Sequence, residues 1–131
     1  MSNHSWAFAV AFVATIATPV AAQDEFMGRT DIGAGRAAFR IHCASCHSLE
    51  AGKTIKGPSL KGVYGRAIGS DRSFAYSSAL RDRKGAWTEP TLNTYLRDPF
   101  EMGTDVNMVV HGMTDDRMRG DVIAFLKFEA K

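Results

Sequence analysis

Hydrophobic residues follow helical spacing toward both ends of the chain, and no stretch shows the alternation of a β-strand of any length. Near the C-terminus, the sequence "TDDRMRGDVIAFLK" predicts a helix that starts at Thr114, with Asp115 and Asp116 at its positive end. Residues three or four positions apart give this helix one apolar stripe, formed by Met118, Val122, Phe125 and Leu126.

Two further helices are predicted from their ends. Thr30 or Asp31 can cap a helix that runs into the sequence "IHC", and its apolar side carries Ile32, Gly35, Ala38 and Phe39. In "WTEPTLNTYLRDP", Thr88 is a cap, Glu89 and Pro90 lie in the first turn, and Asp98-Pro99 is the stop signal.

The middle of the chain reads mainly as loop. Residues 48–73 include five glycines and one proline, residues 75–83 predict a short helical piece, and residues 99–113 show no clean period. We therefore expect an all-α fold, with helices at both ends of a loop-rich middle. A loop region of this length is a poor core by itself and needs a further group to pack around.

The first 22 residues differ from the remainder. They contain no Lys, Arg, Asp or Glu, and the apolar run from Trp6 to Ala17 is followed by Val20 and Ala22, small residues that a signal peptidase accepts. We interpret residues 1–22 as a secretory signal peptide and residues 23–131 as one domain. An uncleaved membrane anchor is the weaker interpretation, because a bilayer needs about 20 apolar residues and this run is shorter.

Composition and charge narrow the functional classes. The 131 residues fit one domain, the 45% of hydrophobic residues is average for a globular protein, and the net charge of +2 is too small for typical nucleic-acid binding. The charges are nevertheless polarised, because residues 29–84 carry eleven basic and four acidic residues whereas residues 85–131 carry five and eight.

The sequence "CASCH" contains both cysteines of the chain, Cys43 and Cys46, followed by His47. Cys-x-x-Cys-His is a c-type haem attachment signature, in which two thiols bind one porphyrin and the next residue reaches its iron. A thioredoxin-like dithiol would follow a strand in a βαβ unit, a zinc site would need a fourth ligand, and a structural disulfide would leave His47 unexplained.

A haem that transfers electrons needs a second axial ligand, and methionine or histidine would serve. The candidates are Met102, Met108, Met113, Met118 and His111, of which Met118 belongs to the apolar stripe of the last helix. Spacing alone does not choose among the others.

From about Gly33 to Lys127 the chain resembles the class I cytochromes c. "GRAAFRIHCASCH", "GPSLKGVYGR" and "GDVIAFLK" are similar to the family's first helix, its Gly-Pro-x-Leu-x-Gly loop and its last helix, in that order. The resemblance implies one domain built around a single haem c, attached through Cys43 and Cys46 and ligated by His47 and Met108.

The same resemblance assigns the surrounding residues. It implies that Pro58 orients His47 through its carbonyl group and that Tyr95 lies beside the sulfur ligand. It places Arg66, Tyr76 and Trp87 near the haem propionates. Gly35 and Phe125 are expected to let the first and last helices cross closely.

The implied function is one-electron transfer in the periplasm, by a non-enzymatic and monomeric protein of a respiratory or photosynthetic chain. Its partners would be a dehydrogenase, a quinol-oxidising complex, an oxidase or a photosynthetic centre. The sequence departs from the family before Met108, where "TDVN" replaces Pro-Gly-Thr-Lys and Val106 replaces a hydroxyl group. We therefore expect a less firmly held iron–sulfur bond. The alternative function is a haem-based sensor in which a small gas displaces Met108.

Overall fold

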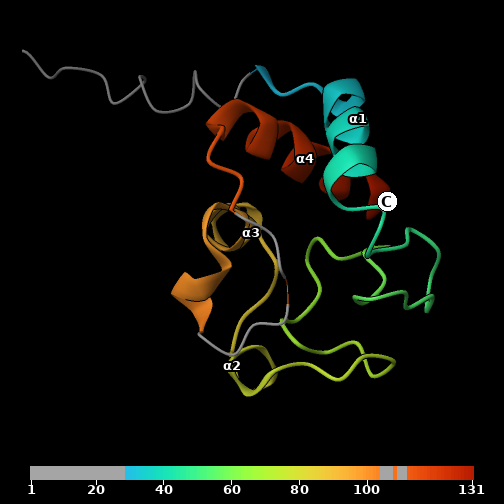
Figure 1. Cartoon of the computed structure of the whole chain (residues 1–131), viewed down its shortest axis with the longest axis vertical. Helices are drawn as coiled ribbons and strands as arrows, with labels where there is room; N and C mark the ends of the chain where they lie inside the picture. Colours follow the sequence, from blue (N-terminus) through green and yellow to red (C-terminus); the bar gives the residue numbers. More distant parts are fainter. Residues whose placement is uncertain (1–28, 104–107, 109–111) are drawn as a thin grey trace, which may run out of the picture.

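The computed structural model describes residues 29–103, 108 and 112–131, so the predicted signal peptide lies outside the described residues. The described part is helical with long loops, as expected (Figure 1). Its elements are the α-helices α1 (Ile32–His42), α2 (Ser78–Arg81), α3 (Glu89–Arg97) and α4 (Asp116–Glu129), and the 3-10 helix η2 (Pro99–Met102).

Helix α1 begins where the sequence predicts. The Asp31 side chain accepts hydrogen bonds from the N–H groups of Gly33 (2.7 Å) and Ala34 (3.0 Å), which otherwise lack partners at a helix start. The backbone N–H of Asp31 donates to the buried carboxylate of Asp121 at 2.7 Å. The start of α1 is thereby tied to α4. Ile32 was expected on the apolar side, but its side chain is exposed because it lies in this first turn.

Helix α4 begins two residues later than expected. Asp115, not Thr114, is the N-cap, since its side chain accepts a hydrogen bond from the N–H of Met118 at 2.9 Å. The predicted apolar stripe is confirmed, because Val122, Phe125 and Leu126 are buried and Met118 packs partly buried against them.

Helices α1 and α4 cross at one end of the molecule (Figure 1). A Cβ atom at Gly35 would lie 2.6 Å from the carbonyl carbon of Asp121 and 2.9 Å from Cβ of Phe125. The missing side chain therefore permits the crossing, as the sequence predicts. Phe39 and Phe125 fill it from the two helices, with ring centroids 5.5 Å apart.

The segment after α3 is more ordered than the sequence suggests. Pro99–Met102 was expected to be loop but forms η2, because Asp98 accepts a hydrogen bond from the N–H of Phe100 at 3.0 Å and the proline fixes the first backbone angle. Pro99 and Met102 are buried in this turn.

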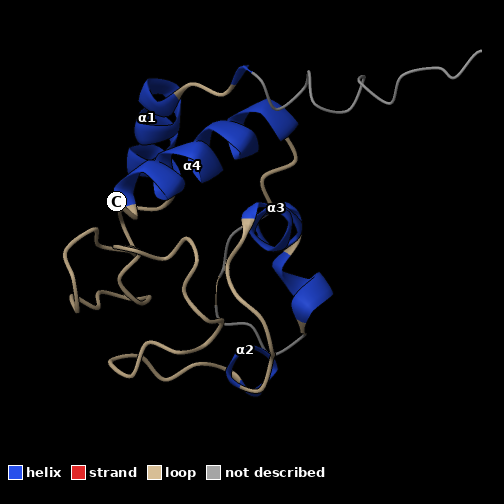
Figure 2. Cartoon of the chain, turned by 180° about the vertical axis from the view of Figure 1, so that it is seen from behind, coloured by secondary structure: helices blue, strands red, loops and turns tan. Residues whose placement is uncertain are grey.

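Residues 43–77 run without a helix around the side of the molecule opposite η2 (Figure 2). The glycine content predicts this for residues 48–73, whereas the helical piece expected over residues 75–83 is shorter and covers only Ser78–Arg81. Two isolated β-bridges, His47 with Thr54 and Ala67 with Ala86, fasten these loops. No helix within residues 29–103, 108 and 112–131 has the length and apolar character needed to cross a membrane.

Replacement of Gly35 by Ala tests the helix crossing. The added methyl group would contact the backbone of Asp121, so we expect Gly35→Ala to lower the free energy of unfolding by about 1–3 kcal/mol. The control is Gly120→Ala on α4, where the nearest atom would be Thr30 Cγ2 at 3.6 Å. Guanidinium unfolding curves that coincide for the two variants would contradict this interpretation.

Candidate functional site

The described helices and loops line an apolar cavity of about 460 Å³. Its walls come from the end of α1, the loops of residues 56–77, the helices α2, α3 and α4, and the segment before α4. The structure brings all the site residues named from the sequence to this cavity: Cys43, Cys46, His47, Pro58, Arg66, Tyr76, Trp87, Tyr95 and Met108.

A single turn after α1 presents the two thiols and the imidazole. The N–H of Cys43 still donates to Phe39 of the helix, at 2.8 Å, and the N–H groups of Cys46 and His47 both donate to the carbonyl oxygen of Cys43, at 3.0 and 2.9 Å. Because the chain folds back at each of these bonds, Cys43, Cys46 and His47 all line the same cavity.

The chemistry of the cysteines argues against two of the alternatives. They are not joined as a disulfide, and burial, followed by the neighbouring Cys46, raises the pKa of Cys43 to about 11. A thiol–disulfide enzyme needs the opposite, a thiolate at neutral pH. The part of the chain that is described also holds no group of three or more His, Cys, Asp and Glu residues placed to bind a metal ion such as zinc.

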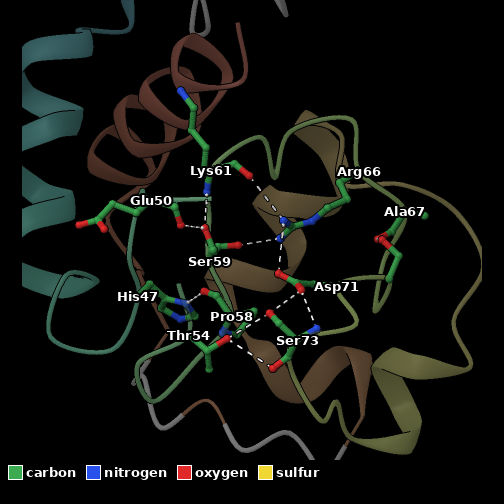
Figure 3. Close-up of polar contacts among 11 residues, drawn as sticks. His47, Glu50, Thr54, Pro58, Ser59, Lys61, Arg66, Ala67, Asp71 and Ser73 are labelled. Atoms are coloured by element: carbon green, nitrogen blue, oxygen red, sulfur yellow. Dashed lines mark hydrogen bonds and ion pairs between the residues drawn. The ribbon is translucent and has the colours of Figure 1, made fainter. Parts of the chain in front are cut away.

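The imidazole of His47 is held by a hydrogen bond to the carbonyl oxygen of Pro58, 2.8 Å from Nδ1 (Figure 3). Burial lowers the pKa of His47, although this bond opposes the shift, so the ring is neutral at pH 7. A neutral ring that donates from Nδ1 has its lone pair on Nε2. The structure therefore leaves Nε2 as the atom able to ligate a metal.

The loop that carries Pro58 lies against the cysteine turn. The N–H groups of Lys56 and Gly57 both donate to the carbonyl oxygen of Cys46, at 3.1 and 2.8 Å. A Cβ atom at Gly57 would lie 2.8 Å from Nδ1 of His47, so only glycine leaves room for the ring at this place. In the sequence, Gly57 is the first residue of the Gly-Pro-x-Leu-x-Gly loop, but nothing local shows which side chain will lie over it.

Two residues of the lining carry buried polar atoms without partners among the described residues, Arg66 Nε and Ser77 Oγ. Two nitrogens of Arg66 are used, since Nη2 donates to the carbonyl oxygen of Ser59 at 2.9 Å and Nη1 lies 3.8 Å from a carboxylate oxygen of Asp71 (Figure 3). Unpaired buried donors are costly, so these two atoms suit acceptor groups of a ligand. Ser77 was missed, although its place next to Tyr76 was a usable signal.

Two aromatic residues form a further part of the lining. Trp87 and Tyr95 are buried, with ring centroids 5.0 Å apart. Burial is the main cause that raises the pKa of Tyr95 to about 12, so its hydroxyl group is protonated and can donate a hydrogen bond into the cavity.

The structure reduces the candidates for a second axial ligand. Met108 and Met113 line the cavity, whereas Met102 and Met118 do not, and His111 lies outside the described residues. Met113 is fixed by its backbone, because its N–H donates to the carbonyl oxygen of Leu96 at 2.7 Å. Met108 is only partly buried against the core.

These residues fit a haem group. Two thiols and a neutral imidazole lie on one wall, a thioether sulfur is present in the lining, and unpaired buried donors are available for the haem carboxylates. The remaining lining is mainly apolar and aromatic, which suits a porphyrin face, and Val63, Leu80, Leu92 and Leu96 belong to it.

Comparison with known proteins agrees with this fit. The Cytochrome c family model matches residues 32–128. The chain is 38% identical over 94 residues to a cytochrome c of Ulva intestinalis, which covers 71% of this chain and 85% of that protein. It is 44% identical over 85 residues to cytochrome c2 iso-2 of Magnetospirillum fulvum, which covers 65% of this chain and 88% of that protein.

A solved structure shows the same fold. Cytochrome cH from Methylobacterium extorquens superposes with a TM-score of 0.69 at 36% sequence identity. The match covers 75% of this chain and 98% of that one.

Replacement of Gly57 by Ala tests how the imidazole is held. The methyl group would overlap the ring of His47, so the ring or the loop must move. We expect Gly57→Ala to cost about 1–3 kcal/mol of unfolding free energy. Unfolding followed by circular dichroism measures the loss, and Gly120→Ala again serves as the control. A stability equal to that of the unmodified protein would mean that the ring does not lie on this backbone.

Proposed function

The chain belongs to the cytochrome c family, and we propose that it carries single electrons between redox proteins of the periplasm, with His47 and Met108 as the axial ligands of its haem iron. Members of this family are electron carriers and bind haem c covalently. The observation that carries the proposal for this chain is that Cys43, Cys46, His47 and Met108 line one apolar cavity.

When bound, haem c supplies an iron that alternates between the ferrous and ferric states. In our proposal, Cys43 and Cys46 tether it from the turn after α1. Their common turn, closed by hydrogen bonds to the carbonyl oxygen of Cys43, supports this role. Because both thiols and His47 belong to one short turn, the two attachment points of the haem and the imidazole ligand keep fixed positions relative to one another.

The residues around the ligands restrict movement when the charge changes. Pro58 holds His47 by the bond to Nδ1, and Gly57 seats the ring on the backbone. We propose Tyr95 as the donor that faces the methionine sulfur, and Arg66, Tyr76, Ser77 and Trp87 as the residues around the haem carboxylates. Burial of the iron among apolar side chains disfavours the ferric charge and raises the reduction potential.

We propose Met108 rather than Met113 as the second ligand. Both line the cavity, but Met113 is 92% buried and its backbone is hydrogen-bonded to α3, which is typical of a core residue. Met108 lies nine residues after Pro99, in the register that also places Pro58, Arg66 and Trp87 at the family's positions.

For the cellular setting, we propose the periplasm. The proposed signal peptide of residues 1–22 would export the chain, where c-type haem is attached. As partners we propose a dehydrogenase, a quinol-oxidising complex, an oxidase or a photosynthetic centre. Basic residues outnumber acidic ones in residues 29–84, and acidic residues outnumber basic ones in residues 85–131. This separation of charge would orient the approach of such a partner.

Replacement of Met108 by Ala tests the ligand. We expect Met108→Ala to abolish the ferric iron–sulfur charge-transfer band, because no sulfur then reaches the iron. Met118→Ala, at a methionine outside the cavity lining, is the control and should keep the band. A band that survives in Met108→Ala and disappears in Met113→Ala would assign the bond to Met113.

A second function, that of a small-gas sensor, is favoured by the sequence "TDVN" before Met108, where the family has Pro-Gly-Thr-Lys. In this alternative, Met108 leaves the iron and carbon monoxide or nitric oxide takes its place. For an electron carrier, a titration of the ferrous protein with carbon monoxide at neutral pH should leave the spectrum unchanged. Complete conversion at micromolar carbon monoxide would instead support the sensor.

A further inference from the structure

Arg119 is a buried cation on α4 that lies outside the cavity lining. Only 4% of the residue is exposed, and each of its three guanidinium nitrogens has a partner. Nε donates to the side-chain oxygen of Asn93 on α3 at 2.7 Å, Nη1 donates to the carbonyl oxygen of Met113 at 2.6 Å, and Nη2 donates to Asp116. One side chain thus connects α3, α4 and the segment that precedes α4.

Burying the guanidinium group of Arg119 carries a cost in free energy. A buried guanidinium loses its hydration, and its one carboxylate partner, Asp116, is 62% exposed and so gives a screened attraction. An apolar side chain would fill the same place on α4 without that cost. What arginine adds is a rigid set of donors that can hold several groups at fixed angles.

The backbone of Met113 is held on both sides. Its carbonyl oxygen accepts from Arg119, and its N–H donates to the carbonyl oxygen of Leu96 at 2.7 Å. The preceding residue, Gly112, lies so near α3 that a Cβ atom there would be 2.7 Å from the carbonyl carbon of Arg97. The chain is therefore fixed at residues 112 and 113, four and five residues after Met108.

A second arginine holds the other side of the same segment. Nη2 of Arg83 donates to the carbonyl oxygen of Met102 at 3.2 Å, six residues before Met108. Met102 is itself buried in η2. In the sequence, Met108 thus lies between Met102 and Met113. The carbonyl oxygen of each of these two residues accepts a hydrogen bond from an arginine of a different part of the chain.

We propose that Arg119, assisted by Arg83, is a positioning residue that determines how firmly Met108 holds the iron. The inference rests on the proposed function, in which Met108 is the axial ligand. The iron–sulfur bond is then an intramolecular binding event, and its strength depends on the effective concentration of the sulfur at the iron. Fixed ends restrict the positions that the sulfur can reach, so they raise that concentration.

The affinity of the ferric haem protein for imidazole measures this effect, because imidazole must displace the methionine. In Arg119→Lys the positive charge remains, but one ammonium nitrogen replaces the three guanidinium nitrogens that bond to three different groups. We expect imidazole to bind about tenfold more tightly, the scale of one hydrogen bond from a charged donor. Arg117→Lys, an exposed arginine of the same helix, is the matched control and should leave the affinity unchanged.

The same substitution in a Met108→Ala background separates positioning from general loosening. With no sulfur to displace, Arg119→Lys should no longer change the imidazole affinity. Equal changes in both backgrounds, or no change in either, would overturn the inference while leaving the proposed function intact. If Met108→Ala itself keeps the iron–sulfur band, the ligand assignment fails, and the inference with it.

Arg83→Ala provides a second variant that does not disturb the buried site on α4. Arg83 is exposed, so its loss should be tolerated by the fold. We expect imidazole to bind about threefold more tightly, since the lost bond is long and partly exposed. An unchanged affinity in both Arg83→Ala and a folded Arg119→Lys would show that neither arginine positions Met108.

Discussion

The structure depends on a cavity of about 460 Å³ at the place where its loops and helices meet. In core substitutions, each Å³ of cavity costs about 24 cal/mol of unfolding free energy, so a group that fills this cavity stabilises the fold by roughly 10 kcal/mol. A domain of this size is stable by about 5–15 kcal/mol in total. The group that fills the cavity is therefore a large part of the core, which explains how residues 43–77 hold their course without a helix.

The filling of this cavity also serves electron transfer. Contacts that complete the core also fix the positions of the ligands, because His47 is bonded to Pro58 and lies on the backbone of Gly57. Arg66 carries the connection further, since it bonds to Ser59 next to Pro58 (Figure 3). A site held from the loop in this way has few atoms free to rearrange when the charge on the iron changes.

Local patterns predicted the parts of the molecule that local chemistry determines. The helix starts near Asp31 and Thr88, the apolar stripe of α4 and the Cys-x-x-Cys-His turn depend on residues close together in the sequence. The remainder required the fold. The close fit of Gly57 to His47, the unpaired hydroxyl group of Ser77 and the separation of Met102 from the cavity come from segments that meet only in three dimensions.

The central claim is that the iron lies between His47 and Met108, and proton NMR of the ferrous protein tests it most directly. The ring current of a porphyrin shifts a methyl group bound above it far upfield, so an axial methionine is visible without any substitution. We predict one strongly shifted methionine methyl resonance, with through-space contacts to Tyr95 and an assignment to Met108. An assignment to Met113, or no shifted methyl resonance at all, would contradict the account.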